Sequence, residues 1–156
     1  MEKFKSGFVT VVGKTNVGKS SIINRLVGEK ISAIANKPQT TRTRIRGIIN
    51  RKNSQIIIMD TPGLHKSKSK LGNMMNENAI TSIPDVDIVL YVIDATEKSI
   101  DERILDKIKE SNKKTILIIN KIDLVDAKKV AEIIDKYKKI YDFTAIIPVS
   151  VKKEKN

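Results

Sequence analysis

The chain has 156 residues, of which 40% are hydrophobic and 31% charged, with no cysteine and a single histidine, His65. This composition suits one compact soluble domain and excludes disulfides, thiol catalysis and cysteine- or histidine-based zinc sites, so any metal must be held by oxygen. The net charge of +12 comes entirely from residues 1–70, which hold 15 lysines and arginines against three acidic residues. This imbalance is typical of a protein that binds a polyanion such as RNA, although a solvated lysine-rich surface gives the same pattern.

The first half of the chain predicts a strand, a helix and a hairpin. Residues 8–12 are a short apolar run, and residues 19–28 carry apolar side chains at helical spacing. Residues 31–44 have no clear period and are predicted to form an exposed loop. Residues 44–50 and 55–60 are predicted to form two strands, and the short polar stretch RKNS between them is typical of a β-hairpin.

The second half predicts strands that alternate with helices. After a polar loop over 60–72 and a helix over 71–83, residues 86–95 and 113–120 are nearly continuous runs of Val, Ile and Leu. Such runs are typical of strands covered on both faces, as in a parallel sheet. A final strand is predicted over 143–149.

Two amphipathic helices are predicted between and after these strands, over residues 99–112 and 127–142. Ser99 and Asp101 are alternative caps for the first of them. Strands that alternate with helices predict an α/β fold with a doubly wound sheet and right-handed crossovers. We expect a six-stranded, mostly parallel sheet with one antiparallel strand and helices on both faces.

Residues 13–20 read GKTNVGKS and match the phosphate-loop pattern G-x-x-x-x-G-K-[ST] between a predicted strand and helix. Its backbone N–H groups and the helix N-terminus favour phosphate, Lys19 should reach the β- and γ-oxygens, and Ser20 should offer its hydroxyl to Mg²⁺. The predicted nucleotide-binding residues of this loop are Gly13, Asn16, Val17, Gly18, Lys19, Ser20 and Ser21. By itself the loop fits kinases, ATPases and GTPases.

Two further motifs, DTPG and NKID, narrow the choice of nucleotide. Asp60 ends a strand where it could orient a magnesium-bound water, and the N–H of Gly63 could meet a γ-phosphate. The carboxylate of Asp123 can accept from both N1–H and the exocyclic amine of guanine, and adenine offers neither donor on that edge. Asn120 would brace the loop, and the stem of Lys121 would lie along the purine. The motifs together predict a guanine nucleotide.

GKTNVGKS, DTPG and NKID, in this order, resemble the motifs of the translation-factor class of GTPases. The stretch ISAIANKPQTTRTRIRGI, followed by DTPGLH, resembles the Era family of bacterial ribosome-assembly GTPases. The resemblance covers essentially the whole chain and implies a P-loop NTPase fold of the small-GTPase type. It also implies slow Mg²⁺-dependent GTP hydrolysis that couples the GTP and GDP states to binding of the small ribosomal subunit and its 16S rRNA, with no DNA partner.

The resemblance also implies a domain organisation. Members of the Era family carry, after the GTPase domain, a KH domain that binds the 3′ end of small-subunit ribosomal RNA, and residues 1–156 show no counterpart of it. We therefore expect a single GTPase domain that is a fragment of a longer protein. A cytoplasmic location is expected, with peripheral contact with the inner membrane left open.

Further site residues are assigned only by the resemblance. Thr41, with Thr40 as the alternative, would be the second hydroxyl ligand of Mg²⁺, beside Ser20 and Asp60. The predicted catalytic residues are Lys19, Thr41 and Gly63. The last predicted segment of the site is Ser150, Val151 and Lys152. It corresponds to a Ser-Ala motif in the family, where a backbone N–H donates to the guanine O6. Val151 departs from that pattern, but a main-chain contact should tolerate it.

Leu64 stands where many GTPases have a glutamine that orients the attacking water. Related GTPases with an N-V-G-K-S loop hold K⁺ through the asparagine, so one hypothesis is that Asn16 binds K⁺. The alternative is that Asn16 only hydrogen-bonds within the loop. Arg42 as an internal arginine finger and His65 as a general base are further alternatives.

Other functions remain open from the residues alone. One is another GTPase of the same class, acting in tRNA modification or as a single-domain assembly factor. A different class is a nucleotide-gated binding module with negligible turnover, which Leu64 would suit. A phosphotransferase fits the phosphate loop, but a guanine-specific carboxylate gives a kinase no advantage.

Overall fold

The computed structural model describes residues 2–28, 44–60, 83–154 and 156. The elements, including the short 3₁₀ turns η1 and η2, are β1 (Lys5–Val12), α1 (Lys19–Val27), β2 (Arg44–Arg51), β3 (Ser54–Asp60), η1 (Ile83–Asp85), β4 (Ile88–Asp94), α3 (Glu102–Ser111), β5 (Lys114–Asn120), η2 (Ile122–Leu124), α4 (Ala127–Lys138) and β6 (Ala145–Pro148). The loops predicted over 31–44 and 60–72 and the helix predicted over 71–83 lie almost wholly outside the described residues.

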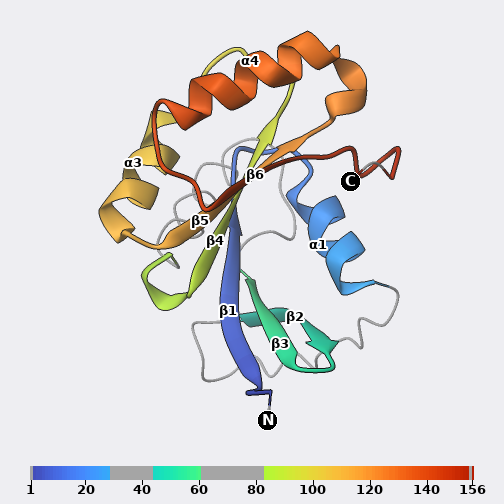
Figure 1. The fold of residues 1–156 in the computed structure, drawn as a ribbon, viewed down its shortest axis with the longest axis vertical. Helices are drawn as coiled ribbons and strands as arrows, with labels where there is room; N and C mark the ends of the chain where they lie inside the picture. The colour runs from blue at the N-terminus through green and yellow to red at the C-terminus, as the bar shows by residue number, and fades with distance from the viewer. Residues whose placement is uncertain (1, 29–43, 61–82, 155) are drawn as a thin grey trace.

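The strands form one six-stranded sheet in the order β2-β3-β1-β4-β5-β6. Strand β2 runs antiparallel to β3, and every other neighbouring pair is parallel. The predicted six-stranded, mostly parallel sheet with one antiparallel strand is therefore confirmed. Because parallel strands end at the same edge, the loops that follow β1, β4, β5 and β6 gather at one end of the sheet (Figure 1).

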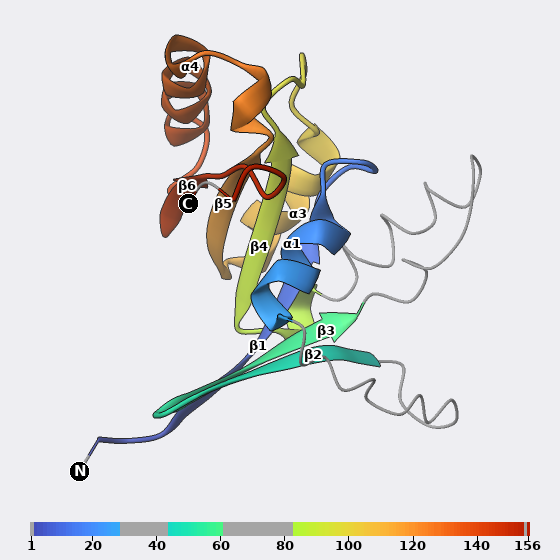
Figure 2. The same cartoon turned by 90° about the vertical axis from the view of Figure 1, so that its right-hand side faces the viewer.

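Strand β1 begins at Lys5, before the apolar run that predicted it. Its first half pairs with β3, from Lys5 opposite Ser54 to Val9 opposite Ile58. Only from Val9 onward does β1 also pair with β4. Figure 2 shows this first half and the β2–β3 hairpin extending together beyond the helices. Side chains at the start of β1 are exposed, so no apolar pattern marks that part of the strand.

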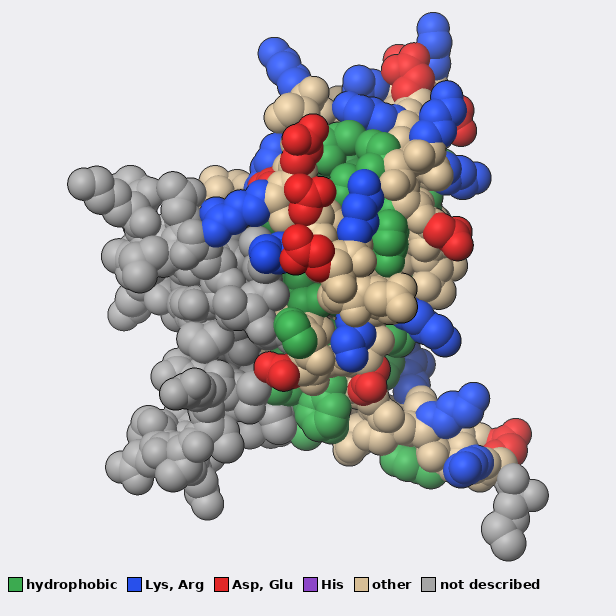
Figure 3. All heavy atoms as spheres, turned by 90° about the vertical axis from the view of Figure 1, so that its left-hand side faces the viewer, with side chains coloured by type: hydrophobic (Ala, Val, Ile, Leu, Met, Phe, Trp, Pro, Cys, Tyr) green, Lys and Arg blue, Asp and Glu red, His purple; other side chains and the backbone are tan. Residues whose placement is uncertain are grey.

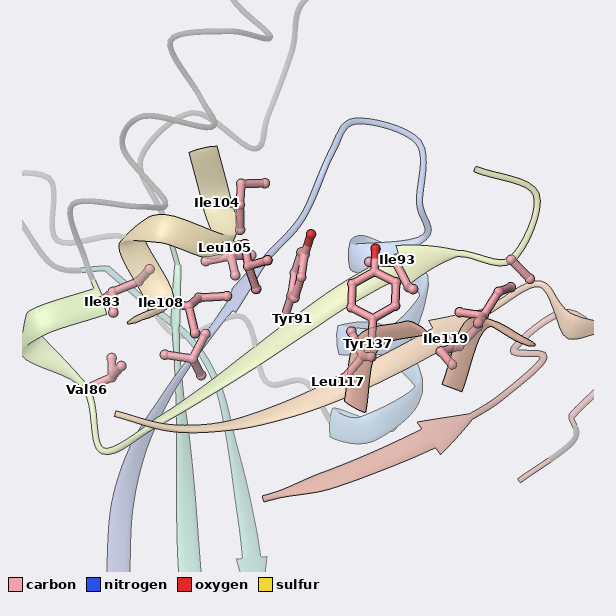
Figure 4. Close-up of a cluster of buried hydrophobic side chains, with 14 of the residues drawn as sticks. Ile83, Val86, Tyr91, Ile93, Ile104, Leu105, Ile108, Leu117, Ile119 and Tyr137 are labelled. Atoms are coloured by element: carbon pink, nitrogen blue, oxygen red, sulfur yellow. The ribbon is translucent and has the colours of Figure 1, made fainter. Parts of the chain in front are cut away.

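Helices cover both faces of the sheet, as predicted. On one face α3 and α4 pack on the central strands around a cluster of buried side chains that includes Tyr91, Ile108, Leu117 and Tyr137 (Figure 4). The rings of Tyr91 and Tyr137 meet edge to face, with centroids 6.3 Å apart. On the other face α1 buries Ile22 and Ile23 against the sheet. Helices on both faces leave the central strands buried on each side, which accounts for their unbroken apolar sequences.

The helix ends follow local capping chemistry. The side chain of Asp101, rather than Ser99, caps α3 by accepting from the N–H of Ile104 at 3.2 Å. Helix α4 ends at Lys138, earlier than the predicted residue 142. The apolar pattern continues past this end because Ile140 still packs on the core from a tighter turn.

None of the described helices is long and apolar enough to cross a membrane. Over the described part of the face that carries α3, acidic and basic side chains are interspersed (Figure 3).

Candidate nucleotide-binding site

Two glycines shape the phosphate loop between β1 and α1. Gly13 has φ 155° and Gly18 has φ 100°, backbone conformations that favour glycine. A Cβ on Gly13 would lie 2.4 Å from the carbonyl oxygen of Val92, and a Cβ on Gly18 would lie 2.2 Å from the side-chain nitrogen of Asn120. Glycine is therefore required at both positions for close approach as well as for conformation.

Lys19 begins α1 at the end of this loop and is 8% exposed. Its ammonium donates to the carbonyl oxygen of Gly13, at the other end of the loop. Burial lowers the pKa of Lys19 to about 8, because desolvation disfavours the charged form. The ammonium therefore lies within the loop that would hold phosphate, while Ser20 and Ser21 are exposed on the first turn of α1.

Asn120 joins three loops. It ends β5, is 4% exposed, and its side-chain N–H donates to the carbonyl oxygen of Val17 in the phosphate loop at 2.9 Å. Its side-chain oxygen accepts from the backbone N–H of Val151 at 3.4 Å. A single buried amide thus fixes the phosphate loop against both the NKID segment and the segment after β6.

Asp123 and Ser150 face each other across this junction. The hydroxyl of Ser150, which is fully buried, donates to a carboxylate oxygen of Asp123 at 2.6 Å. This hydrogen bond is the main reason that the pKa of Asp123 lies below its ordinary value, and nearby Lys152 and Lys153 act in the same direction. The carboxylate is therefore ionised and orientated, as acceptance of two guanine N–H groups requires.

Lys121 adopts a left-handed conformation, with φ 63°. Its ammonium donates to the carbonyl oxygen of Asn16 at 2.7 Å and pairs with the carboxylate of Asp94 at 2.8 Å. Burial raises the pKa of Asp94, but the hydrogen bonds from Lys121 and Thr96 outweigh it, and the pKa is lowered overall. Lys121 thereby ties the NKID segment to the phosphate loop.

Sequence reasoning did not include Asp94 in the site. Asp94 ends β4 directly opposite Asn120, which ends β5. The signal was available, because Asp60 and Asn120 were both selected as polar residues that end an apolar strand. The contacts of Lys14, in the phosphate loop, with Glu97 and with the carbonyl oxygen of Ser99 had no comparable signal in the sequence.

Several residues considered for the site cannot be placed. Outside the described residues lie Thr40, Thr41, Arg42, Gly63, Leu64 and His65. Of Asp60 only the backbone, at the end of β3, is described. The described part of the site nevertheless joins a phosphate loop to a carboxylate suited to guanine. Such an arrangement can hold one nucleotide at both its phosphates and its base.

A protein-family model described as "50S ribosome-binding GTPase" matches residues 8–121. Proteins named GTPase Era from Ruminiclostridium cellulolyticum and Clostridium perfringens are 46% and 45% identical to this chain over 152 and 155 residues. These alignments cover 96% and 98% of this chain but 51% and 52% of the relatives. The chain therefore spans about half the length of the curated relatives it matches.

Solved structures agree with this similarity. Era in complex with MgGDPNP and a segment of 16S ribosomal RNA aligns with a TM-score of 0.75 and 42% identity, over 98% of this chain and 53% of the other. A variant of Aquifex aeolicus Era bound to GDP and aluminium fluoride aligns with a TM-score of 0.74 and 42% identity, over 98% and 54%. The resemblance that the motifs indicated is confirmed.

Proposed function

Because this chain belongs to the family of 50S ribosome-binding GTPases, we propose that residues 1–156 act as a single GTPase domain that binds GTP and GDP with Mg²⁺ and hydrolyses GTP slowly. The observation that carries the proposal is the junction at Asn120. It links the phosphate loop, through the carbonyl oxygen of Val17, to the segment that holds Asp123 and Ser150. One nucleotide could therefore be held at its phosphates and at its base.

In the proposed mechanism the chain neutralises charge and positions phosphate. Lys19 would leave the Gly13 carbonyl for the β- and γ-phosphate oxygens, and the loop amides would bind the remaining oxygens. Ser20 would hold Mg²⁺ with Asp60 and Thr41. Ser20 is exposed at the start of α1, and Asp60 ends β3, the parallel neighbour of β1, so the two residues fit this assignment. Mg²⁺ would neutralise charge that develops on the phosphates.

A direct test measures nucleotide binding and phosphate release by this chain. Isothermal titration with GTP, GDP and ATP should give binding of both guanine nucleotides and an affinity for ATP that is at least about 10³-fold lower, since ATP leaves the Asp123 carboxylate unpaired. Single-turnover release of phosphate would distinguish a hydrolysing switch from a binding module. Equal affinity for ATP and GTP would contradict the proposed specificity.

We further propose that the nucleotide state of this domain controls binding of the whole protein to small-subunit ribosomal RNA. One support is that a relative with 42% identity is known in complex with MgGDPNP and 16S ribosomal RNA. The other is the basic excess of residues 1–70. An RNA-binding KH domain beyond this chain, a cytoplasmic location, peripheral contact with the inner membrane and the absence of a DNA partner remain predictions.

For the cation, we propose that Asn16 binds K⁺ beside the phosphates. Asn16 is exposed and adopts a left-handed conformation with φ 64°. Its carbonyl oxygen accepts from Lys121, so the backbone that carries its side chain is held in place. Hydrolysis should be at least about tenfold faster in KCl than in NaCl, because K⁺ would stabilise charge on the transferred phosphate.

The matched variant is Asn16→Gly, because glycine keeps the positive φ while it removes the amide. This variant should bind GTP within about threefold of the unsubstituted chain and lose the preference for K⁺. Phosphate release measured at equal ionic strength in the two salts checks both statements. Equal rates in KCl and NaCl for the unsubstituted chain would overturn the assignment.

A further inference from the structure

The turn between β4 and α3, residues 94–99, contacts the phosphate loop through Lys14. The ammonium of Lys14 lies 3.4 Å from a carboxylate oxygen of Glu97 and donates to the carbonyl oxygen of Ser99 at 3.1 Å. Lys14 is the second residue of the phosphate motif, at a position where the pattern accepts any residue. The pattern therefore does not account for this pair of contacts.

The same turn reaches the phosphate loop a second time through Lys121. Asp94 pairs with the ammonium of Lys121 at 2.8 Å, and that ammonium donates to the carbonyl oxygen of Asn16 at 2.7 Å. The backbone N–H of Asp94 donates to the other carboxylate oxygen of Glu97 at 3.2 Å. Asp94 and Glu97 are therefore connected to each other and, through two lysines, to positions 14 and 16 of the loop.

Polar contacts hold the side chain of Glu97, which is only 17% exposed. Glu97 and Lys98 border two cavities, of about 160 and about 450 Å³, that lie between the turn and the segment leading into and along α4. Between these cavities, the carboxylate of Glu97 is held by the ammonium of Lys14 and by the backbone N–H of Asp94.

We infer that Glu97 and Asp94 are positioning residues of the nucleotide site, which hold the phosphate loop in its binding conformation through Lys14 and Lys121. This inference rests on the proposed function. A loop that is already in place loses less conformational freedom on binding, so the contacts favour GTP and GDP equally. They touch neither phosphate nor base, and the hydrolysis step does not depend on them.

Three variants test the contact at Lys14: Glu97→Gln, Lys14→Met and the double substitution. Each single variant should weaken binding of both GDP and GTP by about three- to tenfold, measured by isothermal titration. The double variant should bind GDP and GTP with about the same affinity as the single variant that binds more weakly, because both substitutions break the same contact. The KM for GTP should rise with kcat unchanged.

Direct contact between Lys14 and phosphate predicts a different result. Glu97→Gln would then free the ammonium and tighten binding, and tighter binding overturns the inference. Multiplicative losses in the double variant, or unchanged affinity in Glu97→Gln, overturn it as well. The control pair is Lys107→Met with Glu110→Gln, which breaks an exposed ion pair of 3.2 Å on α3 and should leave affinity unchanged.

The outcome also separates this inference from the proposed function. Failure of the unsubstituted chain to bind GTP would contradict the proposed function itself. Normal binding by the unsubstituted chain, together with unchanged binding by Glu97→Gln, would contradict only the positioning role. Thermal unfolding midpoints without nucleotide should differ little between Glu97→Gln and the unsubstituted chain, which distinguishes positioning of the loop from loss of the fold.

Discussion

Replacement of Asp123 by asparagine should weaken GTP binding by roughly 10²- to 10³-fold and create affinity for xanthosine triphosphate. The carboxylate offers only acceptors, and guanine presents two donors on the facing edge. An asparagine amide offers one acceptor and an NH₂ group, which would face the exocyclic amine of guanine. Xanthine carries a carbonyl oxygen in place of that amine, so its edge matches the amide.

Isothermal titration with GTP, xanthosine triphosphate and ATP would measure this change of specificity. The matched control is Asp126→Asn, three positions along the chain. Asp126 caps α4 by accepting from the N–H of Lys129 at 2.8 Å, and asparagine caps helices about as well. The control should therefore keep its preference for GTP. Unchanged GTP affinity in Asp123→Asn would show that Asp123 does not read the base.

The central strands could be predicted because their sequences report burial directly. Residues 88–94 and 114–120 are apolar almost without interruption, since helices cover both of their faces. The start of β1 could not be predicted, because its side chains are exposed and only its pairing with β3 defines the strand. Likewise, the end of α4 is hidden by apolar residues that continue to pack on the core beyond the last helical turn.

The motifs and their order along the chain also predicted which residues lie together in the site, but not the hydrogen bonds and ion pairs that join them. Asn120 and Asp123 could be selected because they follow an apolar strand within a known order of motifs. The bond from Asn120 to the carbonyl oxygen of Val17 links residues that are 103 positions apart, and no local pattern encodes it. The same holds for Lys14 and Glu97, because an ion pair between two turns depends on the tertiary fold.

Substitution of Lys19 by methionine should abolish nucleotide binding and also stabilise the nucleotide-free chain, by about 1–2 kcal/mol. Burial lowers the pKa of Lys19 from 10.5 to about 8, and each pKa unit corresponds to about 1.4 kcal/mol. The charged form therefore destabilises the empty fold by on the order of 3 kcal/mol. Methionine removes that cost but leaves the carbonyl oxygen of Gly13 without its donor, so the net gain is smaller.

The lowered pKa of Lys19 also makes the stability of the chain depend on pH. Between about pH 8 and pH 10.5 the unfolded chain keeps the Lys19 proton while the folded chain releases it. The stability of the unsubstituted chain should therefore rise with pH in that range, and the advantage of the methionine variant should be full at pH 7 and shrink above pH 8. Tyr137, whose pKa is raised to about 12 by burial, acts in the opposite direction above about pH 10, so pH 7–9.5 is the useful window.

Thermal unfolding with and without GTP separates stability from binding. At pH 7 without nucleotide, Lys19→Met should unfold roughly 3–6 °C higher than the unsubstituted chain. With excess GTP and Mg²⁺ the order should reverse, because only the unsubstituted chain gains binding energy. Lys128→Met, at an exposed position on α4, serves as the control and should change neither midpoint appreciably. A lower midpoint for Lys19→Met without nucleotide would mean that the ammonium stabilises the empty loop. The buried charge would then be a structural element of the fold as well as a phosphate ligand.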